Sequence, residues 1–184
     1  MKGKKSVFFL ALCLFLMILT GCSDMMNTPS RRVEEFLGKY QMMDQEVVKD
    51  LDKTIEESNY SEEGKEEYKN LMQKQYQNLT YKIKNEQTDG DQATVEVEIE
   101  VFDYANALEK ANDYIKEYEE EFQEDEKKGS AKKKEEYKIK QLKAVTDKAH
   151  YTINFSLTKD DKRWKLNPIS DVDVEKIHGL YPSF

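Results

Sequence analysis

The chain has few of the residues that carry most protein chemistry, with two cysteines and two histidines among 184 residues. Cys13 lies inside an apolar run near the N-terminus, and Cys22 follows that run. Beyond them no thiol remains for a disulfide, a zinc cluster or a cysteine nucleophile. His150 and His178 are too few to form a metal site, which takes at least three protein ligands. Glycine-rich phosphate loops and Gly-x-Ser-x-Gly or His-Glu-x-x-His motifs are also absent. The sequence therefore predicts no metal and no cofactor, and a fold stabilised by packing alone.

Long hydrophobic runs are also missing, apart from a short one that follows a basic N-terminus. Three lysines precede an unbroken apolar stretch from Val7 to Leu19. This stretch is shorter than the roughly 20 residues that a membrane-spanning helix needs, and it has the length of the apolar core of a signal peptide. It ends in the residues Leu19-Thr20-Gly21-Cys22. An aliphatic residue, two small residues and cysteine resemble the lipobox of bacterial lipoproteins.

The lipobox resemblance implies a lipid-anchored protein. It implies transfer of diacylglyceryl to the Cys22 thiol and cleavage before Cys22, with the domain on the extracytoplasmic face of the cell membrane. The expected organisation is a signal peptide at 1–21, a polar tether at 22–30 and one domain at 31–184. An ordinary secretory signal with an incidental cysteine and an uncleaved anchor are the alternatives.

Positive charge is scarce in the expected mature chain. Removal of residues 1–21 leaves 26 of the 29 basic residues against all 37 acidic ones, a formal charge near −11. Nucleic acid and anionic bilayers attract clustered Lys and Arg, so this balance excludes nucleic acid as a partner. Acyl chains on Cys22, rather than charge, are expected to hold the protein at the membrane.

The hydrophobic periodicity predicts helices first and then strands. Ser30 is expected to cap a helical region that reaches residue 58, either as one helix or as two broken near Asp44, and Ser61 a second helix. From residue 79 the period changes to two, and Asp89-Gly90-Asp91 predicts the turn of a hairpin whose second strand is residues 94–102. A second hairpin is expected at 151–166, followed by a short helix that ends at Gly179.

A helical insertion at 104–148 is expected between the two hairpins. Apolar residues recur there at heptad spacing, and Gly129-Ser130 separates an acidic block from a lysine-rich one. This pattern predicts two antiparallel helices joined at Gly129-Ser130, although a solvated linker at 123–135 fits the composition equally well. The heptad positions are Tyr104, Leu108, Ala111, Ile115, Tyr118 and Phe122.

These elements predict an α+β fold in which N-terminal helices pack on a curved antiparallel sheet of two hairpins. The Val-Glu-Glu-Phe-Leu-x-x-Tyr run at 33–40, the Asp89-Gly90-Asp91 turn and the late Lys162-Arg163-Trp164-Lys165-Leu166 strand resemble secreted lipoproteins of the NTF2-like, cystatin-like class. That resemblance implies a cone-shaped sheet whose mouth binds ligands in some members. The helical insertion departs from the family pattern, and a different helix-on-sheet arrangement remains the alternative.

The aromatic residues of the sheet region are the candidate ligand-binding residues, because an open cone would place some of them on its wall. They could equally form the hydrophobic core. A non-catalytic domain that binds a small ligand or an envelope protein is expected. The alternatives are an NTF2-like enzyme with an acid in its pocket, for which Asp103 beside a phenol is one candidate, and a purely structural lipoprotein. The candidate ligand-binding residues are Tyr81, Tyr104, Tyr151 and Trp164.

Overall fold

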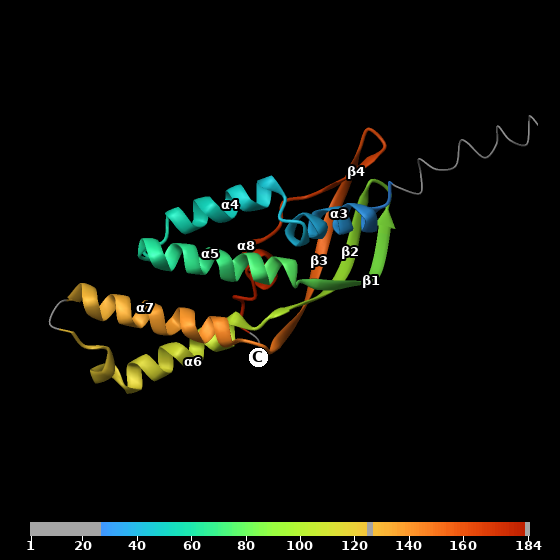
Figure 1. Cartoon of the computed structure of the whole chain (residues 1–184). Coiled ribbons are helices and arrows are strands. Elements are labelled where there is room, and N and C mark those ends of the chain that lie inside the picture. The colour runs from blue at the N-terminus through green and yellow to red at the C-terminus, as the bar shows by residue number, and fades with distance from the viewer. Residues whose placement is uncertain (1–26, 125–126, 183–184) are drawn as a thin grey trace, which may run out of the picture.

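The computed structural model describes residues 27–124 and 127–182, and it confirms the α+β class. A four-stranded sheet occupies one end of the molecule, and long helices extend away from it (Figure 1). The elements in chain order are α3 (Pro29–Gln41), α4 (Gln45–Glu56), α5 (Glu62–Gln77), β1 (Thr80–Asp89), β2 (Gln92–Phe102), α6 (Tyr104–Glu117), the 3-10 helix η1 (Glu119–Phe122), α7 (Lys127–Ala144), β3 (Lys148–Asp160), β4 (Arg163–Leu166) and α8 (Asp171–His178).

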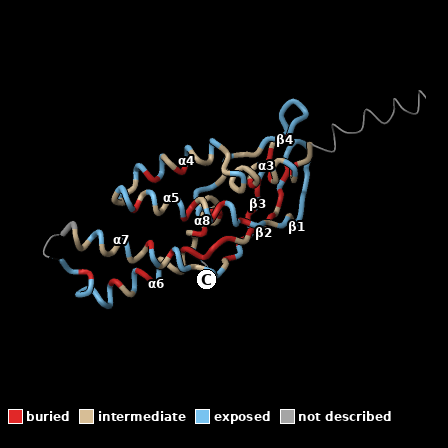
Figure 2. The backbone as a smooth tube through the Cα atoms, viewed as in Figure 1, coloured by how far each residue is buried: buried red, intermediate tan, exposed pale blue. Residues whose placement is uncertain are grey.

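The sheet is antiparallel throughout and has the strand order β1-β2-β3-β4. In β2, Val95, Val97, Ile99 and Val101 are fully buried, whereas the glutamates between them face the solvent side. The buried side chains of β2 and β3 form one core with Val33 and Leu37 of α3 and Ile177 of α8. Figure 2 shows this buried stretch along the two central strands. One face of the sheet is therefore covered by helices, as alternation of apolar and polar residues demands.

The N-terminal helical region consists of two helices rather than one. Met43 adopts a left-handed conformation with φ of 55°, and Asp44 then caps α4 through the N–H of Glu46. The first helix begins two residues earlier than expected. Thr28 caps it and Pro29 occupies its first turn, where a missing N–H costs nothing, so Ser30 lies inside the helix.

The insertion at 104–148 forms two helices that extend from the sheet and return, with α6 and α7 side by side (Figure 1). The expected turn at Gly129-Ser130 is wrong, because both residues lie in the first turn of α7. The heptad pattern also fails at Tyr118, which is 43% exposed because α6 ends at Glu117. A second core joins the insertion to α4 and α5, with Ile139 and Leu142 of α7 against Leu71 and Met72 of α5.

The two cores meet at Gln75, a fully buried polar residue of α5. Its Nε2 donates to the carbonyl oxygens of Phe102 and His178, each at 2.9 Å, and its Oε1 accepts the N–H of Phe102 at 2.8 Å. This amide therefore ties α5 to the end of β2 and to the end of α8. Gly179 follows with φ of 69° and caps α8, as its place in the sequence predicts.

Across residues 27–124 and 127–182, no helix is both long enough and apolar enough to cross a bilayer. The expected signal peptide, and Cys22 with it, lies outside the described residues.

Candidate functional site

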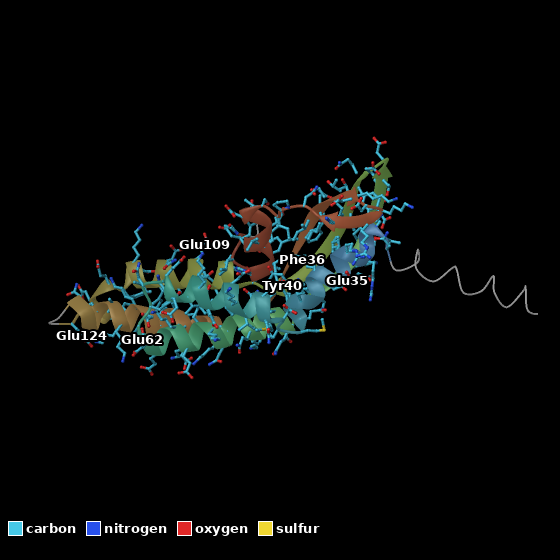
Figure 3. All side chains as sticks on the ribbon, turned by 90° about the horizontal axis from the view of Figure 1, so that it is seen from above. Glu35, Phe36, Tyr40, Glu62, Glu109 and Glu124 are labelled. Carbon is cyan, nitrogen blue, oxygen red and sulfur yellow. The ribbon has the colours of Figure 1, made fainter. Side chains whose placement is uncertain are left out.

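A groove of about 340 Å³ lies where α3, α4, α5 and α8 meet, and we call it the helical groove. Phe36 and Tyr40 contribute its α3 side, one turn apart on the same face (Figure 3). Most of its lining is apolar or aromatic, with a few polar groups. The remaining lining residues are Lys39, Glu46, Val47, Asp50, Leu51, Thr54, Tyr68, Met72, Tyr76, Val174, His178 and Leu180.

A hydrogen-bonded pair from distant parts of the chain lies in this groove. The hydroxyl of Tyr76 is 3.0 Å from Nε2 of His178, and the two rings are 5.4 Å apart. Burial lowers the pKa of His178 to about 4, so the imidazole is neutral at physiological pH. Burial also raises the pKa of Tyr76, which keeps its hydroxyl protonated. The hydroxyl can then donate to Nε2, provided that the imidazole carries its proton on Nδ1.

His178 is neutral although it lies at the end of a helix. A histidine at the end of a helix favours the charged form through the helix dipole. The ring lies between α8 and α5 rather than in solvent, and the loss of hydration outweighs the dipole.

Aromatic rings form one wall of the helical groove. Tyr40 contacts Tyr76 edge-on at 5.0 Å and Phe36 at 5.4 Å, in the T-shaped geometry that aromatic pairs prefer. Burial, and after it the nearby carboxylate of Asp50, raises the pKa of Tyr40. Burial likewise raises the pKa of Tyr68. The phenols therefore stay protonated and can act only as neutral hydrogen-bonding groups.

The charges at the rim of the groove favour some ligands over others. Lys39 is paired with Glu46, whereas Asp50 has no ion pair among the described residues. His178 is neutral, so it supplies no cation for an anionic ligand. Tyrosine faces attract positive charge, and a nearby carboxylate adds to that attraction. The helical groove thus suits an uncharged or positively charged molecule with an apolar body.

The structure places the four candidate ligand-binding residues elsewhere. Tyr104 is buried in the second core, where its hydroxyl donates to the carbonyl oxygen of Leu71 at 3.3 Å. Tyr151 is buried on β3 and donates to the carbonyl oxygen of Tyr181. Tyr81 is half-buried on β1 against the first core. Trp164 is mostly buried on β4, but it lines a second groove beside α3. None of the four lines the helical groove, and their role in binding stays a prediction.

Three further titratable residues have structural partners. Asp103 caps α6 by accepting the N–H of Asn106 at 3.1 Å. His150 is exposed on β3, 3.8 Å from Glu100. Asp173 accepts the hydroxyl of Ser170 at the start of α8 and pairs with Lys176. Among the described residues, no group of three His, Cys, Asp or Glu side chains is placed to hold a metal ion.

The sequence interpretation missed the helical groove, although it contained one usable signal. His178 lies four residues after Val174, which is one helical turn, so the two share a face of α8. Both line the groove. The other walls come from α3, α4 and α5, about a hundred residues away, and no local pattern brings these segments together.

Comparison with known proteins adds one distant likeness. No protein-family model matches the chain, and no curated protein matches it. Among solved structures, it is similar to that of ycdA, a lipoprotein candidate from Bacillus subtilis, with 15% identical residues and a TM-score of 0.47. The likeness covers 74% of this chain and 45% of ycdA, so this chain spans less than half the length of that protein. Similarity of this extent assigns neither a family nor a function.

Proposed function

We propose that the chain is a lipid-anchored, extracytoplasmic binding protein whose helical groove holds a small ligand. The anchor is supported by the basic N-terminus, the 13-residue apolar run and the Leu19-Thr20-Gly21-Cys22 sequence. The groove carries the binding proposal, because it combines an aromatic wall with the neutral Tyr76–His178 pair. Ligand pockets are typically concave and mostly apolar, with a few polar groups that fix orientation.

The chemistry of the groove narrows the ligand class. Protonated phenols and a neutral imidazole can exchange hydrogen bonds with an uncharged polar group. Lys39 offsets the charge of Glu46, and Asp50, which has no ion pair among the described residues, disfavours an anion and favours a cation. We therefore assign to the site a small neutral or cationic molecule with an aromatic or aliphatic body.

We also propose that the domain is an NTF2-like, cystatin-like unit. The helix α3 packed on an antiparallel sheet and the hairpin turn at Gly90 are consistent with an NTF2-like, cystatin-like unit. The face of the sheet beneath α3 is filled by core side chains, so the proposed ligand site lies among the helices rather than in the mouth of a cone.

The anchor is tested by replacing the lipidated cysteine. Cys22→Ala should remove incorporation of radioactive palmitate and either release the protein from membranes or leave an unprocessed precursor. Cys13→Ala is the matched control and should retain label and membrane attachment. Palmitate labelling of the Cys22→Ala chain would contradict the proposed anchor site.

The groove is tested with fluorescent probes of different charge. Neutral 1-N-phenylnaphthylamine should bind, whereas the anionic probe 8-anilinonaphthalene-1-sulfonate should bind at least tenfold more weakly. Thr54→Trp places a large ring at the rim of the groove and should weaken binding of the neutral probe about tenfold. Lys53→Trp adds the same ring on an exposed, non-lining position of α4 and should not. Equal binding by both variants would contradict the proposed site.

A further inference from the structure

The described chain starts at the end of the sheet that lies opposite the long helices (Figure 1). Asn27 is fixed to the turn between β3 and β4: its Nδ2 donates to the carbonyl oxygen of Lys162 at 2.5 Å, and its Oδ1 accepts the N–H of Trp164 at 3.2 Å. Asn27 lies five positions after Cys22 in the sequence, a span of at most about 17 Å when the chain is fully extended. If Cys22 carries the anchor, as proposed above, this end of the sheet lies against the bilayer.

A second groove, of about 420 Å³, lies at this end between α3 and β4, and we call it the anchor-side groove. Its charged lining consists of four cations, Arg32, Lys39, Arg163 and Lys165, and one acid, Glu35. Its apolar wall is Phe36, Trp164 and Leu166. This concentration of positive charge is unexpected in a chain with a net charge of −8.

Part of this positive charge is unsatisfied within the described residues. Nε of Arg32 is buried without a hydrogen-bond partner, although another nitrogen of its guanidinium pairs with Glu35 at 2.7 Å. Arg163 is exposed and forms no ion pair with any residue that the structure describes. Lys165 is paired with Asp160. Guanidinium groups are well suited to phosphate, which they bind through paired hydrogen bonds.

We propose that the anchor-side groove binds the headgroup of an anionic phospholipid in the membrane to which Cys22 is attached. Arg32 and Arg163 would hold the phosphate, and Phe36 and Trp164 would contact the apolar part of the lipid. Proximity to the bilayer favours a lipid over other anions. A lipid also has an apolar part that can contact the apolar wall, which a free phosphate ion lacks. The inference rests on the proposed anchor at Cys22.

Binding of a lipid at this groove determines the orientation of the domain relative to the membrane. The tips of α6 and α7 lie at the far end of the molecule from the groove, so they project away from the bilayer (Figure 1).

Trp164 makes the test direct, because it is the only tryptophan of the chain and lines the anchor-side groove. The lipidated full chain is reconstituted into vesicles of 70% phosphatidylcholine and 30% phosphatidylglycerol. Bromine is placed at equal mole fraction on the acyl chains of either lipid, and quenching of Trp164 is measured. Brominated phosphatidylglycerol should quench at least twice as strongly as brominated phosphatidylcholine, and added salt should reduce the difference.

Matched variants assign the effect to the groove. Arg32→Gln with Arg163→Gln should abolish the preference for phosphatidylglycerol, while Lys110→Gln with Lys116→Gln, on the exposed face of α6, removes the same charge and should keep it. Circular dichroism confirms that both double variants are folded. Equal quenching by the two lipids in the wild type, or a preference that survives loss of both arginines, would overturn the proposal.

Two further results distinguish a failure of the lipid proposal from a failure of the proposed anchor at Cys22. A shift of Trp164 emission by 10 mM inorganic phosphate in pure phosphatidylcholine vesicles, equal to that caused by phosphatidylglycerol, would assign the groove to free phosphate and overturn the lipid proposal. A chain that fails to float with either kind of vesicle would overturn the anchor at Cys22, and the inference with it.

Discussion

The hydroxyl of Tyr76 lies 3.0 Å from Nε2 of His178, although the two residues are 102 positions apart in the sequence. This contact joins the central helix α5 to the C-terminal helix α8 inside the helical groove. The neighbouring residues Gln75 and Gly179 complete the same junction. A single point of the fold therefore connects the groove to both hydrophobic cores.

The stability of the protein should depend on pH through His178. Its pKa is about 4 in the folded protein and about 6.5 when unfolded, so the unfolded chain binds a proton first as the pH falls. The free energy of unfolding should decrease between pH 6.5 and 4, by up to about 3 kcal/mol. Urea unfolding of the wild type and of His178→Gln across this range isolates the effect from that of the carboxylates. Parallel pH profiles would contradict it, and the exposed His150→Gln should behave as wild type.

Gly179 should be far less replaceable than Gly90, although both have positive φ. A Cβ at Gly179 would lie 2.2 Å from the carbonyl oxygen of Phe102 and 2.1 Å from Nε2 of Gln75, whereas nothing lies within 4 Å at Gly90. Left-handed strain costs both alanine variants roughly 1–2 kcal/mol. Gly179→Ala should cost at least about 3 kcal/mol in total, because backbone atoms must also move. Similar melting temperatures for the two variants would show that the junction of α5, β2 and α8 has room for a side chain at position 179.

Glu135 should hold the helical insertion against α5. Its carboxylate accepts the hydroxyl and the N–H of Ser61, at the N-terminus of α5, with the hydroxyl contact at 2.5 Å. Gly64 provides the space for the Glu135 carboxylate, since a Cβ at position 64 would lie 1.9 Å from it. Glu135→Ala should cost about 1–2 kcal/mol through loss of this cap. Its exposed neighbour Glu136→Ala should cost much less, and equal losses in urea unfolding would argue against the cap.

Local signals in the sequence predicted the elements that local interactions determine. Alternation of valine and glutamate predicted β2, and Ser61 and Gly179 predicted the ends of α5 and α8. These features depend on side chains within a few residues of one another, so a short pattern contains them. The α+β class followed from their order.

Competing local signals and long-range packing account for the features that could not be predicted. Gly129-Ser130 has the composition of a turn, yet it lies in the first turn of α7. Ser30 is a good capping residue, but Thr28 and Pro29 start the helix earlier. The helical groove escaped prediction because its walls come from both ends of the chain. Tyr40, Tyr68 and Tyr76 simply resembled core residues of their own helices.

The most direct test of the binding proposal follows the ring nitrogens of the two histidines by NMR while 1-N-phenylnaphthylamine is added. His178 lies in the helical groove and His150 on the exposed part of β3, so the second serves as an internal control. The His178 signals should shift until the site is saturated, those of His150 should stay fixed, and Thr54→Trp should remove the shift. Saturable binding of the probe that leaves His178 unmoved would contradict the account, because the ligand would then occupy another site.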